Sequence, residues 1–215
     1  KLVNGKTLGD EIQKASKWNQ DIITTKDNPV FKGGSIAVLS GSLAPGCAII
    51  KQSAATSELL VHEGKAVVFE NLEDLANRVD TDDLEVTKDD VLVLKSIGPK
   101  GGPGMPEAGL IPIPKKLARQ GVKDMVRVSD GRMSGTASGT IVLHVTPESY
   151  EKGPLAVVKN GDLIKLDVPN RKIDLLISED ELNNRISQIS DNKIKRRGYN
   201  KLYMEEVTQA DEGVD

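Results

Sequence analysis

Short apolar runs separated by glycine-rich or proline-containing turns recur from residue 35 to residue 177, and this pattern constrains the fold more than any other feature. Runs of this length, bounded by turn residues, are typical of buried strands. They predict strands over residues 35–39, 48–51, 65–69, 91–95, 125–128, 141–145, 155–158, 163–168 and 172–177. Asn160-Gly161 and Pro169-Asn170 separate the last three runs, and each predicts a hairpin.

Helix-capping residues precede several of the polar segments between these runs. Their spacing lets a side-chain oxygen accept a hydrogen bond from the first turn of a helix. The capping pairs are Thr7–Asp10, Asn71–Asp74 and Ser178–Glu181, and the predicted helices cover residues 8–17, 72–79, 114–120, 179–189 and 200–209. Strands alternate with helices early and pair as hairpins late, which favours an α/β fold with a mixed sheet or open barrel flanked by helices.

The length of 215 residues favours one main domain with appendages. We expect an N-terminal helix and connector over residues 1–34, a β/α domain over 35–190, and a C-terminal tail over 191–215 that packs on the domain. The basic cluster Lys193–Arg197 is expected to form a solvated face.

Composition excludes several classes of function. A net charge of −3 and an aromatic content of 3% disfavour nucleic-acid binding. No apolar run approaches the roughly 20 residues of a membrane span, and no signal peptide is recognised. The single cysteine, Cys47, excludes an internal disulfide and is expected to be a small buried apolar residue. One thiol cannot supply the several thiolates that an iron–sulfur cluster usually takes.

The segment Ser129–Thr140 concentrates hydroxyl and glycine residues between two apolar runs. Such a loop presents hydroxyls and backbone N–H groups together, as an anion or a reacting hydroxyl requires. Ser134 is the candidate catalytic hydroxyl, with donors from Gly135 and Thr136. The alternative is a solvated turn whose hydroxyls cap the backbone.

A second glycine-rich loop, Gly98–Glu107, also follows an apolar run and ends on a carboxylate. Glu107 is a candidate ligand for Mg²⁺, which commonly takes one or two protein carboxylates. The alternative is an acidic residue in the first turn of the following helix. Lys100 is a candidate anion contact or a solvated charge.

The two histidines, His62 and His144, lack metal-ligand spacing. His144 lies inside an apolar run and is expected to be a hydrogen-bonded core residue.

Taken together, these motifs resemble the C-terminal domain of the dihydroxy-acid and sugar-acid dehydratase family. The resemblance runs in order along nearly the whole chain. The most specific stretches are Gly104-Met105-Pro106-Glu107 and Asp130-Gly131-Arg132-Met133-Ser134-Gly135-Thr136, and others are Leu43-Ala44-Pro45, Ile50–Ala54, Ala66–Glu70, Val142–Val145, Gly153–Ala156 and Gln209–Gly213. Pro106–Gly109 and Pro112–Pro114 favour the pentonate-type branch.

The resemblance implies a swivelling β/α domain that closes over an N-terminal catalytic domain of the same enzyme. That domain would carry the iron–sulfur cluster and most of a Mg²⁺ site. The implied reaction converts a 2,3-dihydroxy sugar acid to a 2-keto-3-deoxy acid. Ser134 matches the serine that removes the C2 proton, Glu107 matches a Mg²⁺ ligand, and Ser134, Gly135 and Thr136 match the residues that hold the substrate carboxylate.

The resemblance also implies a cytoplasmic homo-oligomer, or a mitochondrial-matrix enzyme if the parent chain has a transit peptide. We expect the isolated chain to fold but to be inactive. Two other interpretations stay open at this point: a non-catalytic anion-binding or interaction module, and a separately encoded small subunit of a hydro-lyase.

Overall fold

The computed structural model describes residues 1–13, 15–16, 22–135, 138–190 and 197–215, and the chain divides into two compact units, Lys1–Gly34 and Ser35–Asp215. The first unit contains α1 (Leu8–Ile12). Thr7 begins this helix, as predicted: its hydroxyl accepts the backbone N–H of Asp10, whose carboxylate accepts the N–H of Thr7. The helix is shorter than the predicted span of residues 8–17.

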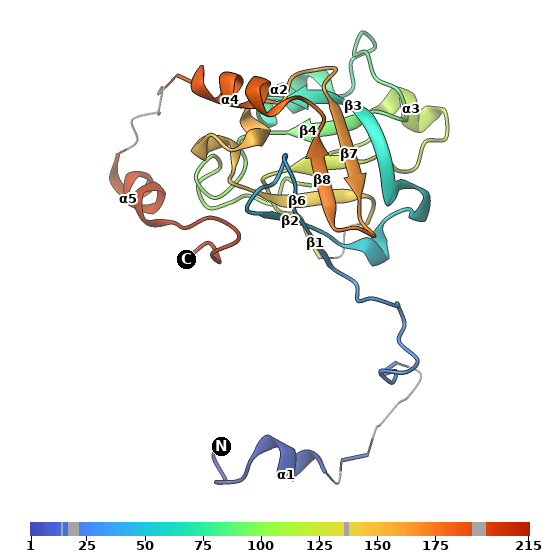
Figure 1. Ribbon diagram of the computed structural model, residues 1–215, viewed down its shortest axis with the longest axis vertical. Helices are drawn as coiled ribbons and strands as arrows, with labels where there is room; N and C mark the ends of the chain where they lie inside the picture. The colour runs from blue at the N-terminus through green and yellow to red at the C-terminus, as the bar shows by residue number, and fades with distance from the viewer. Residues whose placement is uncertain (14, 17–21, 136–137, 191–196) are drawn as a thin grey trace. The chain divides into compact units, whose positions relative to one another are not determined.

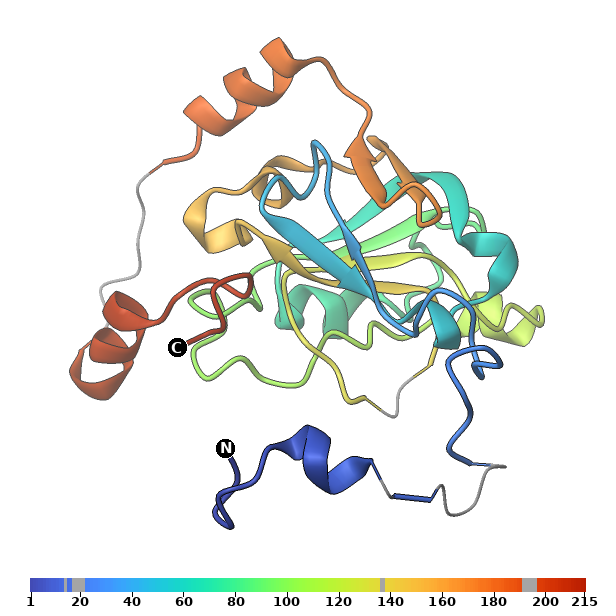
Figure 2. The same ribbon diagram turned by 60° about the horizontal axis from the view of Figure 1, so that its bottom comes forward.

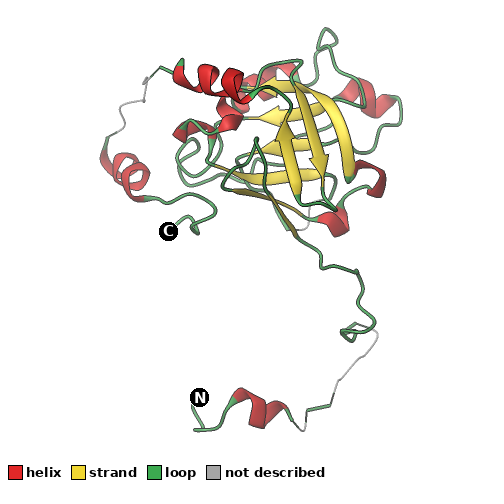
Figure 3. Cartoon of the chain, viewed as in Figure 1, coloured by secondary structure: helices red, strands yellow, loops and turns green. Residues whose placement is uncertain are grey.

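In the second unit, eight strands form one mixed sheet in the order β1-β2-β6-β5-β4-β3-β7-β8. The four central strands, from β6 to β3, pair in parallel, and the outer pairs are antiparallel. The strands are β1 (Ala37–Leu39), β2 (Cys47–Ile50), β3 (Val61–Phe69), β4 (Val91–Leu94), β5 (Arg127–Ser129), β6 (Ile141–Thr146), β7 (Leu163–Asp167) and β8 (Lys172–Leu175). Figure 3 shows the sheet curving into a barrel, which confirms the predicted fold class.

The barrel closes through a short contact between the end of β1 and the start of β8. The N–H of Ser40 donates to the carbonyl of Arg171 at 3.0 Å, and the N–H of Ile173 donates to the carbonyl of Ser40 at 3.2 Å. A side chain at Gly41 would overlap the carbonyl of Ile173, so this close approach requires glycine. The barrel is therefore nearly closed, with a seam between β1 and β8.

Alternation along the central strands divides the core between two faces of the sheet. In β4 every residue is buried, but Val91 and Val93 point into the barrel while Leu92 and Leu94 pack on its outer side. Phe69 at the end of β3 belongs to the same outer cluster. Strands that are covered on both faces have continuous apolar sequences, which explains the short apolar runs at the central strands.

The α-helices lie outside the barrel (Figure 2). They are α2 (Leu72–Arg78), α3 (Lys115–Arg119), α4 (Glu179–Ser187) and α5 (Gly198–Glu206), with short 3₁₀ helices η1 (Gln52–Ala54), η2 (Ser57–Leu59), η3 (Ser149–Glu151) and η4 (Pro154–Val157). The predicted caps of α2 and α4 are confirmed, because the side chains of Asn71 and Ser178 accept hydrogen bonds from the first turns. Among the described residues, no helix is long and apolar enough to cross a membrane.

The predicted strand over residues 155–158 is wrong, because this segment forms η4. Pro154 fixes a helical φ at the start of η4, and Leu155 and Val158 fill the inside of the barrel. Asn160-Gly161 is therefore not a hairpin, and β7 pairs with β3 instead. The hairpin at Pro169-Asn170 is confirmed by the pairing of β7 with β8. Of the basic cluster, residues 193–196 lie outside the described residues.

Candidate functional site

Two loops begin side by side at one edge of the central sheet. The Glu107 loop (residues 96–107) follows β4, and the Ser134 loop (residues 129–140) runs from the end of β5 to β6. Because β4 and β5 are parallel and Leu94 pairs with Ser129, both loops leave the sheet at the same level. Ligands of α/β proteins commonly bind at such carboxyl ends of strands.

Arg132 joins the far end of the Glu107 loop to the Ser134 loop. Its Nε donates to the carbonyl of Met105 at 2.7 Å, and its carbonyl accepts the N–H of Gly109 at 2.7 Å. Glu107 forms an isolated parallel bridge with Arg132, and its carboxylate lies 4.0 Å from the guanidinium. The structure thus brings Glu107 beside the residue two positions before Ser134.

The predicted site residues that the structure describes lie at the protein surface. Glu107, Ser134 and Gly135 are exposed, whereas Thr136 lies outside the described residues. The ammonium of Lys51 donates to the carbonyl of Gly135, so a cation lies against this loop. Glu107 precedes the first residue of α3 by eight positions, which excludes the interpretation as a first-turn acid of that helix.

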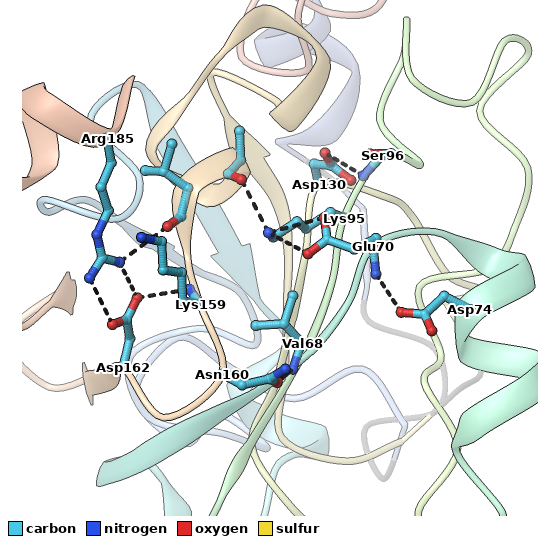
Figure 4. Close-up of polar contacts among 12 residues, drawn as sticks. Val68, Glu70, Asp74, Lys95, Ser96, Asp130, Lys159, Asn160, Asp162 and Arg185 are labelled. Carbon is cyan, nitrogen blue, oxygen red and sulfur yellow. Dashed lines mark hydrogen bonds and ion pairs between the residues drawn. The ribbon is translucent and has the colours of Figure 1, made fainter. Parts of the chain in front are cut away.

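A row of charged residues follows the three neighbouring parallel strands (Figure 4): Glu70 after β3, Lys95 after β4 and Asp130 after β5. The buried ammonium of Lys95 lies 3.0 Å from the carboxylate of Glu70 and donates to the carbonyl of Ala156 at 3.1 Å. This pair lines a cavity of about 400 Å³. A larger cavity of about 780 Å³ lies between β3 and residues 84–90, and no described residue of the two loops lines either cavity.

Asp130, which is fully buried, holds the start of the Glu107 loop. Its carboxylate accepts the backbone N–H groups of Ser96 at 3.3 Å and Ile97 at 3.0 Å, and of Ser149 in η3 at 2.9 Å. Burial raises the pKa of Asp130, and these hydrogen bonds offset part of that effect. Asp130 therefore connects the beginnings of both loops.

Glu148, also fully buried, holds the middle of the Glu107 loop. It accepts the backbone N–H groups of Lys100 at 3.0 Å and Gly101 at 2.8 Å, and the side-chain amide of Gln209 at 2.7 Å. Burial raises the pKa of Glu148, and the nearby charge of Asp130 adds to the increase. Sequence reasoning missed these roles of Asp130 and Glu148, although an acidic residue directly after an apolar run was a usable signal at Asp130.

The sequence matches the family model described as dihydroxy-acid/6-phosphogluconate dehydratase C-terminal over residues 21–214. The chain belongs to this dehydratase family. Its relatives include an L-arabinonate dehydratase of Rhizobium leguminosarum (47% identical), a 6-deoxy-6-sulfo-D-gluconate dehydratase of Pseudomonas putida (45%) and a dihydroxy-acid dehydratase of Carboxydothermus hydrogenoformans (44%). These matches cover 98–99% of this chain but only 37–38% of each relative.

The chemistry of the acidic, histidine and cysteine side chains limits which metal sites the described residues could form. Within the described ranges, no group of three or more histidine, cysteine, aspartate or glutamate side chains could hold a metal ion. The exposed carboxylate of Glu107 fits as a single ligand, since Mg²⁺ commonly takes one or two protein carboxylates. Cys47 is half-buried in β2, and one thiol does not fit an iron–sulfur cluster.

His144 differs from its predicted role as a hydrogen-bonded core residue. It is half-buried in β6, and within the described part of the chain its imidazole makes no hydrogen bond, while its backbone N–H donates to Gly131 at 3.1 Å. Burial and then the charge of Arg132 lower the pKa of His144, so the imidazole is neutral at pH 7. Lys100 was predicted to be an anion contact or a solvated charge, but its ammonium is half-buried and pairs with Glu151 at 3.1 Å. His62 contacts the backbone carbonyl of Asp89, away from the loops.

Proposed function

We propose that this chain is the C-terminal domain of an enzyme that dehydrates a 2,3-dihydroxy sugar acid to a 2-keto-3-deoxy acid. The observation that carries the proposal is the bridge between Glu107 and Arg132, which brings a carboxylate suited to Mg²⁺ onto the loop that bears Ser134. Relatives named as dehydratases of aldonates favour a sugar acid as the substrate. A further relative is named a dihydroxy-acid dehydratase, which agrees with a dihydroxy acid as the substrate class.

Ser134 would act as the base and the surrounding loop as the carboxylate holder. The deprotonated oxygen of Ser134 would take the proton from C2, and the C2=C3 bond would form as the C3–O bond breaks. The Ser134 hydroxyl would then return this proton to the departing hydroxide, which leaves as water, and the resulting enol would tautomerise to the 2-keto acid. Backbone N–H groups of Ser134, Gly135 and Thr136 would bind the substrate carboxylate, because a glycine-containing turn can present several donors to an anion.

A serine hydroxyl is a weak base near neutral pH, so nearby positive charge is required. Lys51, which contacts the carbonyl of Gly135, contributes such a charge from this chain. Mg²⁺, held by Glu107 and by ligands outside this chain, would supply further charge and orient the substrate oxygens. The ligands of an iron–sulfur cluster would also come from outside this chain.

The substitution Ser134→Ala in the full-length enzyme tests this assignment. We expect kcat on aldonates to fall by about 10²–10⁴-fold with a small change in KM, because the base is lost while the backbone donors remain. Ser187→Ala is a matched control, since the exposed hydroxyl of Ser187 donates to the carbonyl of Asn184 in its own helix. Near-normal turnover of Ser134→Ala would remove Ser134 from the mechanism.

A further inference from the structure

We propose that the C-terminal segment, residues 207–215, is a latch that positions the Glu107 loop through Gln209 and Glu148. This inference rests on the proposed function only for its link to Mg²⁺. The geometry that supports it is a continuous series of hydrogen bonds from the C-terminal segment to the loop.

The first contact in the series is a reciprocal pairing between Gln209 and Glu148. The Oε1 of Gln209 accepts the backbone N–H of Glu148 at 2.9 Å, and its Nε2 donates to the carboxylate of Glu148 at 2.7 Å. One side-chain amide therefore satisfies two groups of the same residue. This pairing specifies the position of Gln209 more tightly than a single hydrogen bond would.

The C-terminal segment is folded so that it presents Gln209 in this position. The carbonyl of Gln209 accepts the N–H groups of Glu212 at 3.0 Å and Val214 at 3.2 Å, and Thr208 and Asp215 close the turn by hydrogen bonds in both directions. Val207 is buried at the start of the segment. The segment is thus a compact turn rather than an extended tail.

The second contact runs from Glu148 to the Glu107 loop. Glu148 is fully buried, and Gln209 supplies its side-chain donor while Lys100 and Gly101 supply backbone N–H groups. A side chain at Gly98 would overlap the carboxylate of Glu148, so glycine allows the loop to approach this closely. Without Gln209, a buried charge would lose one of its donors, which is costly in a low-dielectric site.

The remainder of the loop transmits this position to Glu107. Two turns follow the Glu148 contact: the N–H of Gly102 donates to Gly98 at 2.9 Å, and the N–H of Met105 donates to Gly102 at 2.6 Å. The carbonyl of Met105 is then held by Arg132 at 2.7 Å. Glu107 comes two residues later, so Glu148 and Arg132 hold the loop on both sides of its second turn. Gln209 and Glu148 are accordingly positioning residues.

The test compares Gln209→Ala and Gln209→Glu in the full-length enzyme, with Gln188→Ala as the control. Gln188 is an exposed glutamine whose amide contacts Asn184 on its own helix. We expect Gln209→Ala to speed amide hydrogen exchange at Lys100 and Gly101 about tenfold, which corresponds to the loss of roughly one hydrogen bond. The melting temperature should fall only slightly, because this cost is small relative to the unfolding enthalpy of the full-length enzyme. Gln209→Glu should have a larger effect because two carboxylates would face each other.

The half-saturating Mg²⁺ concentration is the second measurement, and we expect it to rise several-fold in both Gln209 variants with a smaller change in kcat. The double variant Gln209→Glu with Glu148→Gln exchanges amide and carboxylate, and it should recover part of the protection at Gly101. If the Gln209 variants only destabilised the fold in general, the double variant would not recover protection from exchange at Gly101.

Unchanged hydrogen exchange at Lys100 and Gly101 in Gln209→Ala would overturn the latch. This result would not depend on which reaction the enzyme catalyses. Faster exchange with unchanged Mg²⁺ dependence would overturn the link from the latch to Glu107. Faster exchange together with near-normal turnover of Ser134→Ala would leave the latch supported and reject the proposed function instead.

Discussion

His144 illustrates how a single residue can depart from the pattern of its strand. Its φ of +54° is unusual for a non-glycine residue and costs about 1–2 kcal/mol. Cys47 of β2 pairs with Thr146 and Ile49 pairs with Leu143, so three residue steps in β6 face two in β2, and the extra residue of this bulge lies in β6 beside His144. Bulges commonly re-aim a side chain beside a functional site. His144 accordingly lies next to Gly131 and Arg132 instead of continuing the buried core.

At this residue we predict that His144→Val destabilises the chain more than His144→Asn, by about 1–2 kcal/mol, because asparagine tolerates a positive φ and a β-branched residue does not. Urea unfolding of the two variants measures the difference. Equal stabilities would show that the backbone at His144 relaxes at no cost.

At the scale of the element, α2 shows how a local signal and a tertiary contact combine. Asn71 caps the helix by accepting the N–H of Asp74 at 2.9 Å, and Asp74 pairs with Arg78 at 2.8 Å. Leu75 and Val79 then bury one side of the helix against the outer face of the sheet. The cap sets where α2 begins, and the buried residues hold it against β3 and β4.

For this element we predict that Asn71→Ala lowers the free energy of unfolding by about 1 kcal/mol, because the N–H of Asp74 loses its acceptor. Asn183→Ala, an exposed change inside α4, is the control and should be neutral or slightly stabilising, since alanine favours helix interiors. Thermal unfolding of both variants measures the effect, and an equal response would contradict the capping role.

At the scale of the whole molecule, Asp124 ties together segments that are far apart in the sequence. Its carboxylate accepts the hydroxyls of Thr56 and Thr140, each at 2.7 Å, and pairs with the buried guanidinium of Arg127 at 2.7 Å. Burial alone would raise the pKa of Asp124, but the hydrogen bonds from Thr56 and Thr140 and the charge of Arg127 outweigh it and lower that pKa. The ionised carboxylate therefore stabilises the fold.

The pH dependence of stability follows from this shift. Because the pKa of Asp124 is lower in the folded state than in the unfolded state, its contribution is present above the ordinary value of about 3.9 and is lost as the pH falls through the folded pKa. We predict that Asp124→Asn costs about 2 kcal/mol at pH 7 and less near pH 3, where this carboxyl is already largely protonated in the unfolded state. Urea unfolding at both pH values measures this, and a pH-independent loss would contradict the prediction.

Local sequence patterns were sufficient for features that depend on neighbouring residues. The caps at Thr7, Asn71 and Ser178 were predicted because a side chain there bonds a backbone group three residues away. Eight of the nine predicted strands match, apart from their ends, because buried strands of a central sheet appear as continuous apolar runs. The two glycine-rich loops, which carry Glu107 and Ser134, were also predicted from local sequence alone.

Tertiary structure alone decided the features that depend on distant partners. The segment 155–158 is as apolar as a strand, but Pro154–Val157 form η4, while β7 pairs with β3 and Leu155 and Val158 pack in the barrel core. Asp130 and Glu148 gained their roles only when folding buried them against the backbone N–H groups of the Glu107 loop. Burial and long-range pairing set these outcomes, whereas sequence pattern sets only what lies within a few residues.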